Sequence, residues 1–182
     1  MCEYCGCQQI AVINELTREH DAVVAAIGET RTHVGNGDLA AAARSCLRIA
    51  AVLGPHTTVE EDGLFTFLTT DFPDHISVLR SEHRRVEAVL SECVNGVPRD
   101  PDWPTRLVST LDLLREHILK EQDGVFPAAL VALDPDQWER IEDLRVAAGS
   151  GLPALPPRPR SRSRSRSRSR PSVTRARRKD RP

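Results

Sequence analysis

The sequence predicts an all-α fold: an up-down four-helix bundle followed by a short fifth helix and a disordered basic C-terminal tail. Of the 182 residues, 40% are apolar but only 4% are aromatic, and the abundant Ala, Leu, Glu and Arg are good helix formers. Four long segments also carry apolar residues at helical spacing, separated by turns that contain Gly or Pro. We therefore expect a Cys-rich N-terminal segment over residues 1–8, a bundle over 9–148 and a tail over 149–182.

The first two helices are expected on either side of a Gly-Asn-Gly turn at residues 35–37. The first covers about 10–33, where apolar residues recur near the helical period. Asp38 is a suitable N-cap for the second, which extends to about Leu68. A proline inside a helix removes a hydrogen bond and crowds the preceding turn, so Pro55 is expected to kink this helix or split it in two.

The second half of the chain shows the same organisation. A third helix is expected over about 74–94, and a fourth follows Pro104 and ends near Pro127. The loop between them is rich in Gly, Pro and Asp. An Asp-Pro pair at 134–135 opens the short fifth helix, which is expected to pack across one end of the bundle.

Charge is distributed unevenly along the chain. Residues 158–182 contain twelve Arg or Lys against a single acidic residue, Asp180, whereas residues 1–157 contain thirteen basic and twenty-five acidic residues. The tail includes five Ser-Arg pairs over 161–170 and has no apolar periodicity, so we expect it to be disordered. Its charge predicts weak, nonspecific binding of nucleic acid or acidic protein. Docking onto the acidic bundle, or no function, are the alternatives.

The cysteines indicate a reducing compartment. Their number, five, is odd and no charged-then-apolar leader precedes Cys2, so a cytoplasmic protein is expected. No apolar run is long enough to span a membrane. Cys2, Cys5 and Cys7 either form part of a zinc, iron-sulfur or dithiol site or belong to a reduced, flexible terminus. Cys46 and Cys93 are expected to pack as small apolar residues.

The residues that best indicate a function lie in and around an internal repeat. Residues 56–65 (HTTVEEDGLF) align without a gap with residues 117–126 (HILKEQDGVF), and five of the ten positions are identical. A Glu-His dipeptide precedes each copy, so that His20 lies 36 residues before His56 and His83 lies 34 residues before His117. The chain is thus predicted to contain two copies of one helical hairpin.

Each copy places a histidine and a glutamate four residues apart, on one face of a helix and about one turn from each other. Packing the two hairpins face to face predicts a metal-ligand set of His20, His56, Glu60, His83, His117 and Glu121. Four imidazoles and two carboxylates suffice for two ions, and mixed imidazole and carboxylate suit iron, zinc or manganese. A duplicated hairpin without metal is the alternative.

Two further residues lie near this set in the sequence. Glu87 stands four residues after His83, where it either extends the site or forms a surface ion pair with Arg84 or Arg85. His75 begins the third helix, eight residues before His83, and is expected to cap the helix or support a ligand rather than bind metal itself.

The pattern of histidines and glutamates over roughly residues 8–130 resembles the hemerythrin-like (HHE cation-binding) family, in its bacterial form. The resemblance implies a hemerythrin-like bundle with a non-haem di-iron centre, in which two oxo- or hydroxo-bridged iron ions meet O2, peroxide or nitric oxide. It implies terminal histidines, with Glu60 and Glu121 bridging. Oxygen-carrying members have a second histidine one turn after the third-helix ligand and an aspartate five residues after the fourth-helix one. This chain has Glu87 and Glu121 at the nearest positions, which argues against reversible oxygen carriage.

Three functions therefore compete. The first is a protein that binds or reacts with O2, peroxide or nitric oxide under oxidative or nitrosative stress. The second is a sensor or regulator of iron, oxygen or redox state with a basic tail that binds nucleic acid or protein, and the third is iron storage. If the chain is an enzyme, the expected activity is catalase- or peroxidase-like decomposition of peroxide. No lone histidine near the set stands out as a proton shuttle, so the sequence does not choose among these functions, and the catalytic residues stay unassigned.

Overall fold

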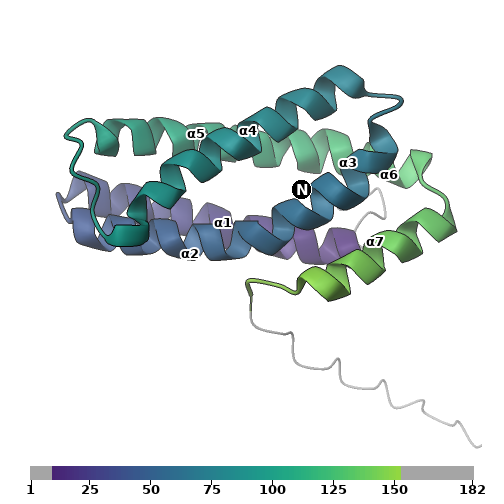
Figure 1. Ribbon diagram of the computed structural model, residues 1–182, viewed down its shortest axis with the longest axis horizontal. Coiled ribbons are helices and arrows are strands. Elements are labelled where there is room, and N and C mark those ends of the chain that lie inside the picture. Colours follow the sequence, from purple (N-terminus) through teal and green to yellow (C-terminus); the bar gives the residue numbers. More distant parts are fainter. Residues whose placement is uncertain (1–9, 153–182) are drawn as a thin grey trace, which may run out of the picture.

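The computed structural model describes residues 10–152, and every regular element within this range is helical (Figure 1). The first rod is α1 (Ala11–Gly35), and the second runs through α2 (Leu39–Thr58), η2 (Val59–Leu64) and α3 (Phe65–Leu68). The third comprises α4 (Pro73–Ser91) and η3 (Glu92–Asn95), and the fourth α5 (Trp103–Lys120), η4 (Glu121–Val125) and α6 (Phe126–Ala132). The short α7 (Pro135–Ala148) follows. Within each half the neighbouring rods pack side by side, α1 on α2 and α4 on α5, which confirms the predicted up-down bundle.

Some of the sequence predictions concern residues outside 10–152. The cluster of Cys2, Cys5 and Cys7 and the basic tail from residue 153 onward both lie outside the described residues. Among the helices of the described part, none combines the length and the apolar character that a membrane-spanning segment requires.

Helix boundaries follow the local chemistry of the chain. Asp38 caps α2, because its side chain accepts a hydrogen bond from the backbone N–H of Ala41 at 2.9 Å. Gly37 precedes it with φ +73°, a conformation that favours glycine. Asp134 and Gln137 form a reciprocal capping box at the start of α7. These caps support the helix starts expected from the sequence.

The second and fourth rods each contain a short π-helical segment where the sequence predicts a continuous α-helix. The helix is not split at Pro55, which lies within α2, but changes its period at Val59. The N–H of Phe65 donates to the carbonyl of Glu60, five residues earlier, and Phe126 donates to Glu121 in the same way. The two π-segments thus occupy the same place in both copies of the repeat, and such segments are frequent at functional sites.

The apolar core consists of two clusters. One contains Ile49 and Leu111 and lies towards the α1–α2 turn, while the other contains Leu16 and Phe65 and lies towards α3 and α6. Cys46 and Cys93 are free, buried thiols in the first cluster, as predicted for small apolar residues. Each rod carries a buried His or Glu between its residues of the two clusters, so the two clusters enclose a polar layer; these residues are His20, His56, Glu82 and Glu121.

The helix α7 packs on η2 and against α1 and α2 (Figure 1). Gly63 in η2 permits this contact, because a Cβ atom there would lie 3.3 Å from Cγ2 of Ile141 in α7. Gly124, the equivalent residue of the second copy, would meet nothing within 4 Å. The same glycine therefore has a packing role in only one half of the repeat.

This difference predicts unequal effects of one substitution. Gly63→Val is expected to destabilise the protein by about 1–3 kcal/mol, because the added methyl groups overpack the contact with Ile141. Gly124→Val is the matched control and should leave the free energy of unfolding nearly unchanged. Urea denaturation of both variants measures the difference, and equal losses would show that α7 does not pack on Gly63.

Candidate metal centre

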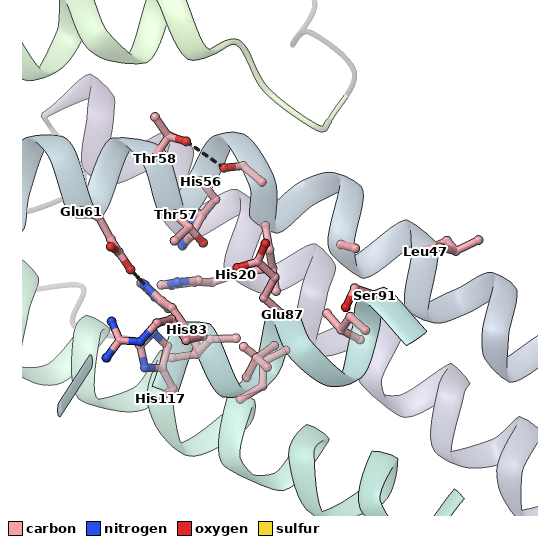
Figure 2. Close-up of a pocket in the computed structure, with 18 of the residues that line it drawn as sticks. His20, Leu47, His56, Thr57, Thr58, Glu61, His83, Glu87, Ser91 and His117 are labelled. Atoms are coloured by element: carbon pink, nitrogen blue, oxygen red, sulfur yellow. Dashed lines mark hydrogen bonds and ion pairs between the residues drawn. The ribbon is translucent and has the colours of Figure 1, made fainter. Parts of the chain in front are cut away.

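A layer of buried polar side chains lies between the two apolar clusters, and each of the four rods contributes to it. His20, His56, Glu60, His117 and Glu121 are all at most 2% exposed. Figure 2 shows the rings of the four predicted histidines gathered at one end of a pocket between the rods. Burial of so many ionisable groups is costly unless they pair with one another or bind a cation.

These side chains form two groups whose potential ligand atoms lie within 4.8 Å of one another. The first group contains His20, His56, Glu60 and Glu121, and the second contains Glu60, His83, His117 and Glu121. All six residues of the predicted ligand set are thereby brought together, and the two glutamates belong to both groups. No ligand residue comes from α7.

Each shared glutamate directs a different oxygen to each group. Oε1 of Glu60 lies 3.2 Å from Nε2 of His56 in the first group, and its Oε2 lies 3.5 Å from Nε2 of His83 in the second. Oε2 of Glu121 lies 3.2 Å from Nε2 of His20, and its Oε1 lies 2.9 Å from Nε2 of His117. Each glutamate therefore has one oxygen available to each group of potential ligands.

The close contacts are not hydrogen bonds. Both oxygens of Glu60 and Glu121, together with Nε2 of His20 and His117, are buried and have no hydrogen-bond partner within residues 10–152. Buried polar atoms without a partner are rare in folded proteins. Here the potential ligand atoms of each group lie within 4.8 Å of one another, so the residues present fit a bound cation.

Electrostatics favour positive charge in this layer. Burial alone would lower the pKa of His56, but the charge of Glu60 and a hydrogen bond to Glu19 raise it to about 10. The pKa of His117 is likewise raised to about 9, mainly by Glu121. Without metal the carboxylates therefore hold protons on His56 and His117, and a metal ion that binds must displace them.

Three of the four histidines donate their Nδ1–H to a carboxylate, which leaves Nε2 free to bind a cation. Nδ1 of His56 lies 3.0 Å from Glu19, and Nδ1 of His117 lies 2.9 Å from Glu82. Glu61 accepts from Nδ1 of His83 at 2.9 Å, whereas Nδ1 of His20 has no partner in the described part of the chain. The sequence alone does not reveal these hydrogen bonds, although Glu19 precedes His20 in the first copy of the repeat and Glu82 precedes His83 in the second.

Glu19 and Glu82, which occupy matching positions in the two copies of the repeat, each form an ion pair with a cationic side chain. Glu82 pairs with Lys120 at 2.5 Å, and Glu19 pairs with Arg145 at 3.0 Å. Burial alone would raise the pKa of both carboxyl groups, but these partners and the hydrogen-bonded histidines hold it below the usual value. Both carboxylates are thus kept charged as acceptors for the histidines.

A pocket of about 500 Å³ extends from the four histidines towards the surface between α2 and α4. Its walls combine apolar side chains, such as Ala50, Leu53 and Leu90, with polar ones, such as Thr57 and Glu87. In Figure 2 Leu47 lies at the end of the pocket away from the histidines, and it is 39% exposed. The pocket can therefore admit a small molecule from solvent to the polar layer.

Two residues considered from the sequence lie outside both groups. Glu87 is exposed and lines the pocket, but within residues 10–152 it forms no ion pair with Arg84 or Arg85. His75 is exposed at the start of α4 and lines a different, apolar pocket beside Lys120. The structure therefore brings neither residue into the cluster of six.

The raised pKa values predict that the metal-free protein loses stability as pH rises. Histidine in the unfolded chain has a pKa near 6.5, so the protonated His56 and His117 stabilise the fold fully below that pH. This contribution should disappear progressively up to about pH 9–10, where the folded protein releases the protons. Melting temperatures of metal-free protein between pH 6 and 10 should fall, and those of metal-loaded protein should fall less. A rising melting temperature without metal would contradict the expectation.

Comparison with known proteins agrees with this geometry. The family profile described as the hemerythrin HHE cation binding domain matches residues 11–129, which include all six clustered residues and leave α7 outside. Neither a search of curated proteins nor a search of solved structures gave a match. The match covers more than half of the 182 residues, and the chain therefore belongs to the hemerythrin family of HHE cation-binding domains.

Proposed function

We propose that this protein binds two iron ions in the polar layer and uses them to react with O2, peroxide or nitric oxide. One observation carries the proposal: Glu60 and Glu121 each offer one oxygen to either group of ligands. The histidines would be terminal ligands and the glutamates would bridge. Mixed imidazole and carboxylate suit iron, and paired iron is a known occupant of helical bundle cores.

The protein's own residues have distinct tasks in this proposal. Bound iron would supply the redox and Lewis-acid chemistry. Glu19, Glu61 and Glu82 orient three of the histidines through Nδ1. The pocket between α2 and α4 would give a small molecule such as O2, peroxide or nitric oxide a route from solvent to the polar layer.

Reaction with peroxide is the activity that we would test first. Catalytic decomposition converts two molecules of hydrogen peroxide to two of water and one of O2. Iron-loaded protein should then release O2 over many turnovers, and Glu121→Ala should not. Consumption of peroxide that stops after about one equivalent per iron pair would favour a sensor or a store over an enzyme.

A second candidate is a cytoplasmic sensor or regulator whose basic tail binds nucleic acid or an acidic protein. The separation of charge supports it, because twelve basic residues lie within 158–182. The described chain also ends close to the metal centre: Ser150 donates a hydrogen bond to Glu19 at 2.6 Å, and Leu152 packs against the apolar core. The tail thus follows directly from a segment that touches a carboxylate supporting a predicted ligand.

A further inference from the structure

The helix α7 lies outside the matched family domain, yet it reaches the proposed metal centre. Arg145 is 7% exposed, and its Nη2 donates to Oε1 of Glu19 at 3.0 Å. Ser150 donates to the same oxygen at 2.6 Å. The other oxygen of Glu19 accepts from Nδ1 of His56. A continuous chain of hydrogen bonds therefore leads from α7 to a histidine of the first group.

The second copy of the repeat builds the equivalent chain from its own residues. Lys120 donates to Oε1 of Glu82 at 2.5 Å, and Oε2 of Glu82 accepts from His117. In the alignment of the two copies, Lys120 corresponds to Val59, which is buried and carries no charge. The first copy therefore lacks the cation that the second one contains, and Arg145 occupies its place from another helix.

Packing fixes Arg145 in this place. Its Nη1 donates to the carbonyl of Gly149 at the end of α7, and its Nη2 also lies 3.1 Å from Glu15. The segment that follows approaches α2 closely, since a Cβ atom on Gly151 would lie 2.5 Å from the carbonyl oxygen of Ala51. The guanidinium group is thus held against Glu19 by contacts on both sides.

We propose that Arg145 is a positioning residue for the first metal position, the one formed by His20, His56, Glu60 and Glu121. The proposal rests on the proposed metal function. Arg145 holds Glu19 in the orientation that accepts from Nδ1 of His56, and this hydrogen bond directs Nε2 into the first group. Loss of such a supporting partner typically weakens metal binding about 10- to 100-fold. Lys120 performs the same task for the second position.

The test uses the full-length protein without metal, titrated with Co²⁺ while visible absorption and bound metal per chain are measured. Arg145→Gln should weaken one of the two binding events about 10- to 100-fold and leave the other unchanged. Arg145→Lys should restore most of the affinity, because the cation is kept. Arg140→Gln is the matched control, since Arg140 is an exposed arginine of the same helix. Lys120→Gln should weaken the other event, and the double variant should weaken both.

The melting temperature of each metal-free variant separates positioning from general support of the fold. If Arg145→Gln binds both ions as the Arg140→Gln control does, the positioning role is wrong while the metal function stands. If it weakens both ions equally and Arg145→Lys gives no rescue, Arg145 supports only the fold and the proposal is overturned. If the unaltered protein binds neither Co²⁺ nor Fe²⁺, the proposed function fails and this inference fails with it.

Discussion

Replacement of Glu60 or Glu121 by alanine is expected to remove most of the metal from both positions. Each carboxylate belongs to both groups, so one substitution takes a ligand from each ion. The loss of affinity should exceed the roughly 10- to 100-fold that follows removal of a partner of a ligand. Metal analysis of the purified variants after equal exposure to iron measures the effect.

Glu87→Ala is the control for this experiment. Glu87 lines the same pocket but is exposed and belongs to neither group, so its loss should leave metal content unchanged. If Glu87→Ala empties the site as completely as Glu121→Ala does, the third rod contributes a second ligand and the set of six is incomplete.

Removal of the chain after Leu152 is expected to abolish retention on heparin or RNA while leaving metal content unchanged. The deleted part contains all twelve basic residues of 158–182, and the remaining chain is strongly acidic. Retention of the full-length protein should fall steeply as salt rises, because binding of a polyanion releases counterions. Chromatography on heparin at several salt concentrations tests this expectation.

The position of this truncation follows from the structure. A cut after Gly149 would also remove Ser150 and Leu152, which contact Glu19 and the apolar core. The cut after Leu152 keeps both contacts and so separates the tail from the metal centre. Unaltered heparin retention would show that another surface binds polyanions, and loss of metal would show that the tail helps to close the site.

The fold could be predicted largely from local signals. Asp38 and Asp134 cap helices where the sequence placed helix starts, and the repeat predicted two similar hairpins. The π-segments could not be predicted, because one additional residue per turn over so short a stretch barely alters the pattern of apolar residues. The second rod, for example, departs from α-helical geometry at Val59 and not at Pro55, where the sequence predicts a kink or a break.

The sequence predicts the six clustered residues but not the residues that hydrogen-bond to them. The spacing of His56 and Glu60, repeated by His117 and Glu121, was enough to propose the clustered residues, and their role as ligands stays a prediction. Glu19 and Glu82 each stand directly before a predicted histidine ligand in the repeat, but the sequence does not show that they accept hydrogen bonds from His56 and His117. Arg145 had none, because it lies outside the repeat and meets Glu19 across 126 positions of the chain. Only tertiary packing brings these two residues together.

The iron content of the full-length protein, expressed with ample iron and purified without chelators, tests the proposed metal centre most directly. Two ligand groups that share Glu60 and Glu121 predict about two irons per chain, as in other paired-metal bundles. The oxidised protein should also show near-ultraviolet absorption from a coupled ferric pair. A single metal ion per chain, or zinc alone after growth with ample iron, would contradict the proposal.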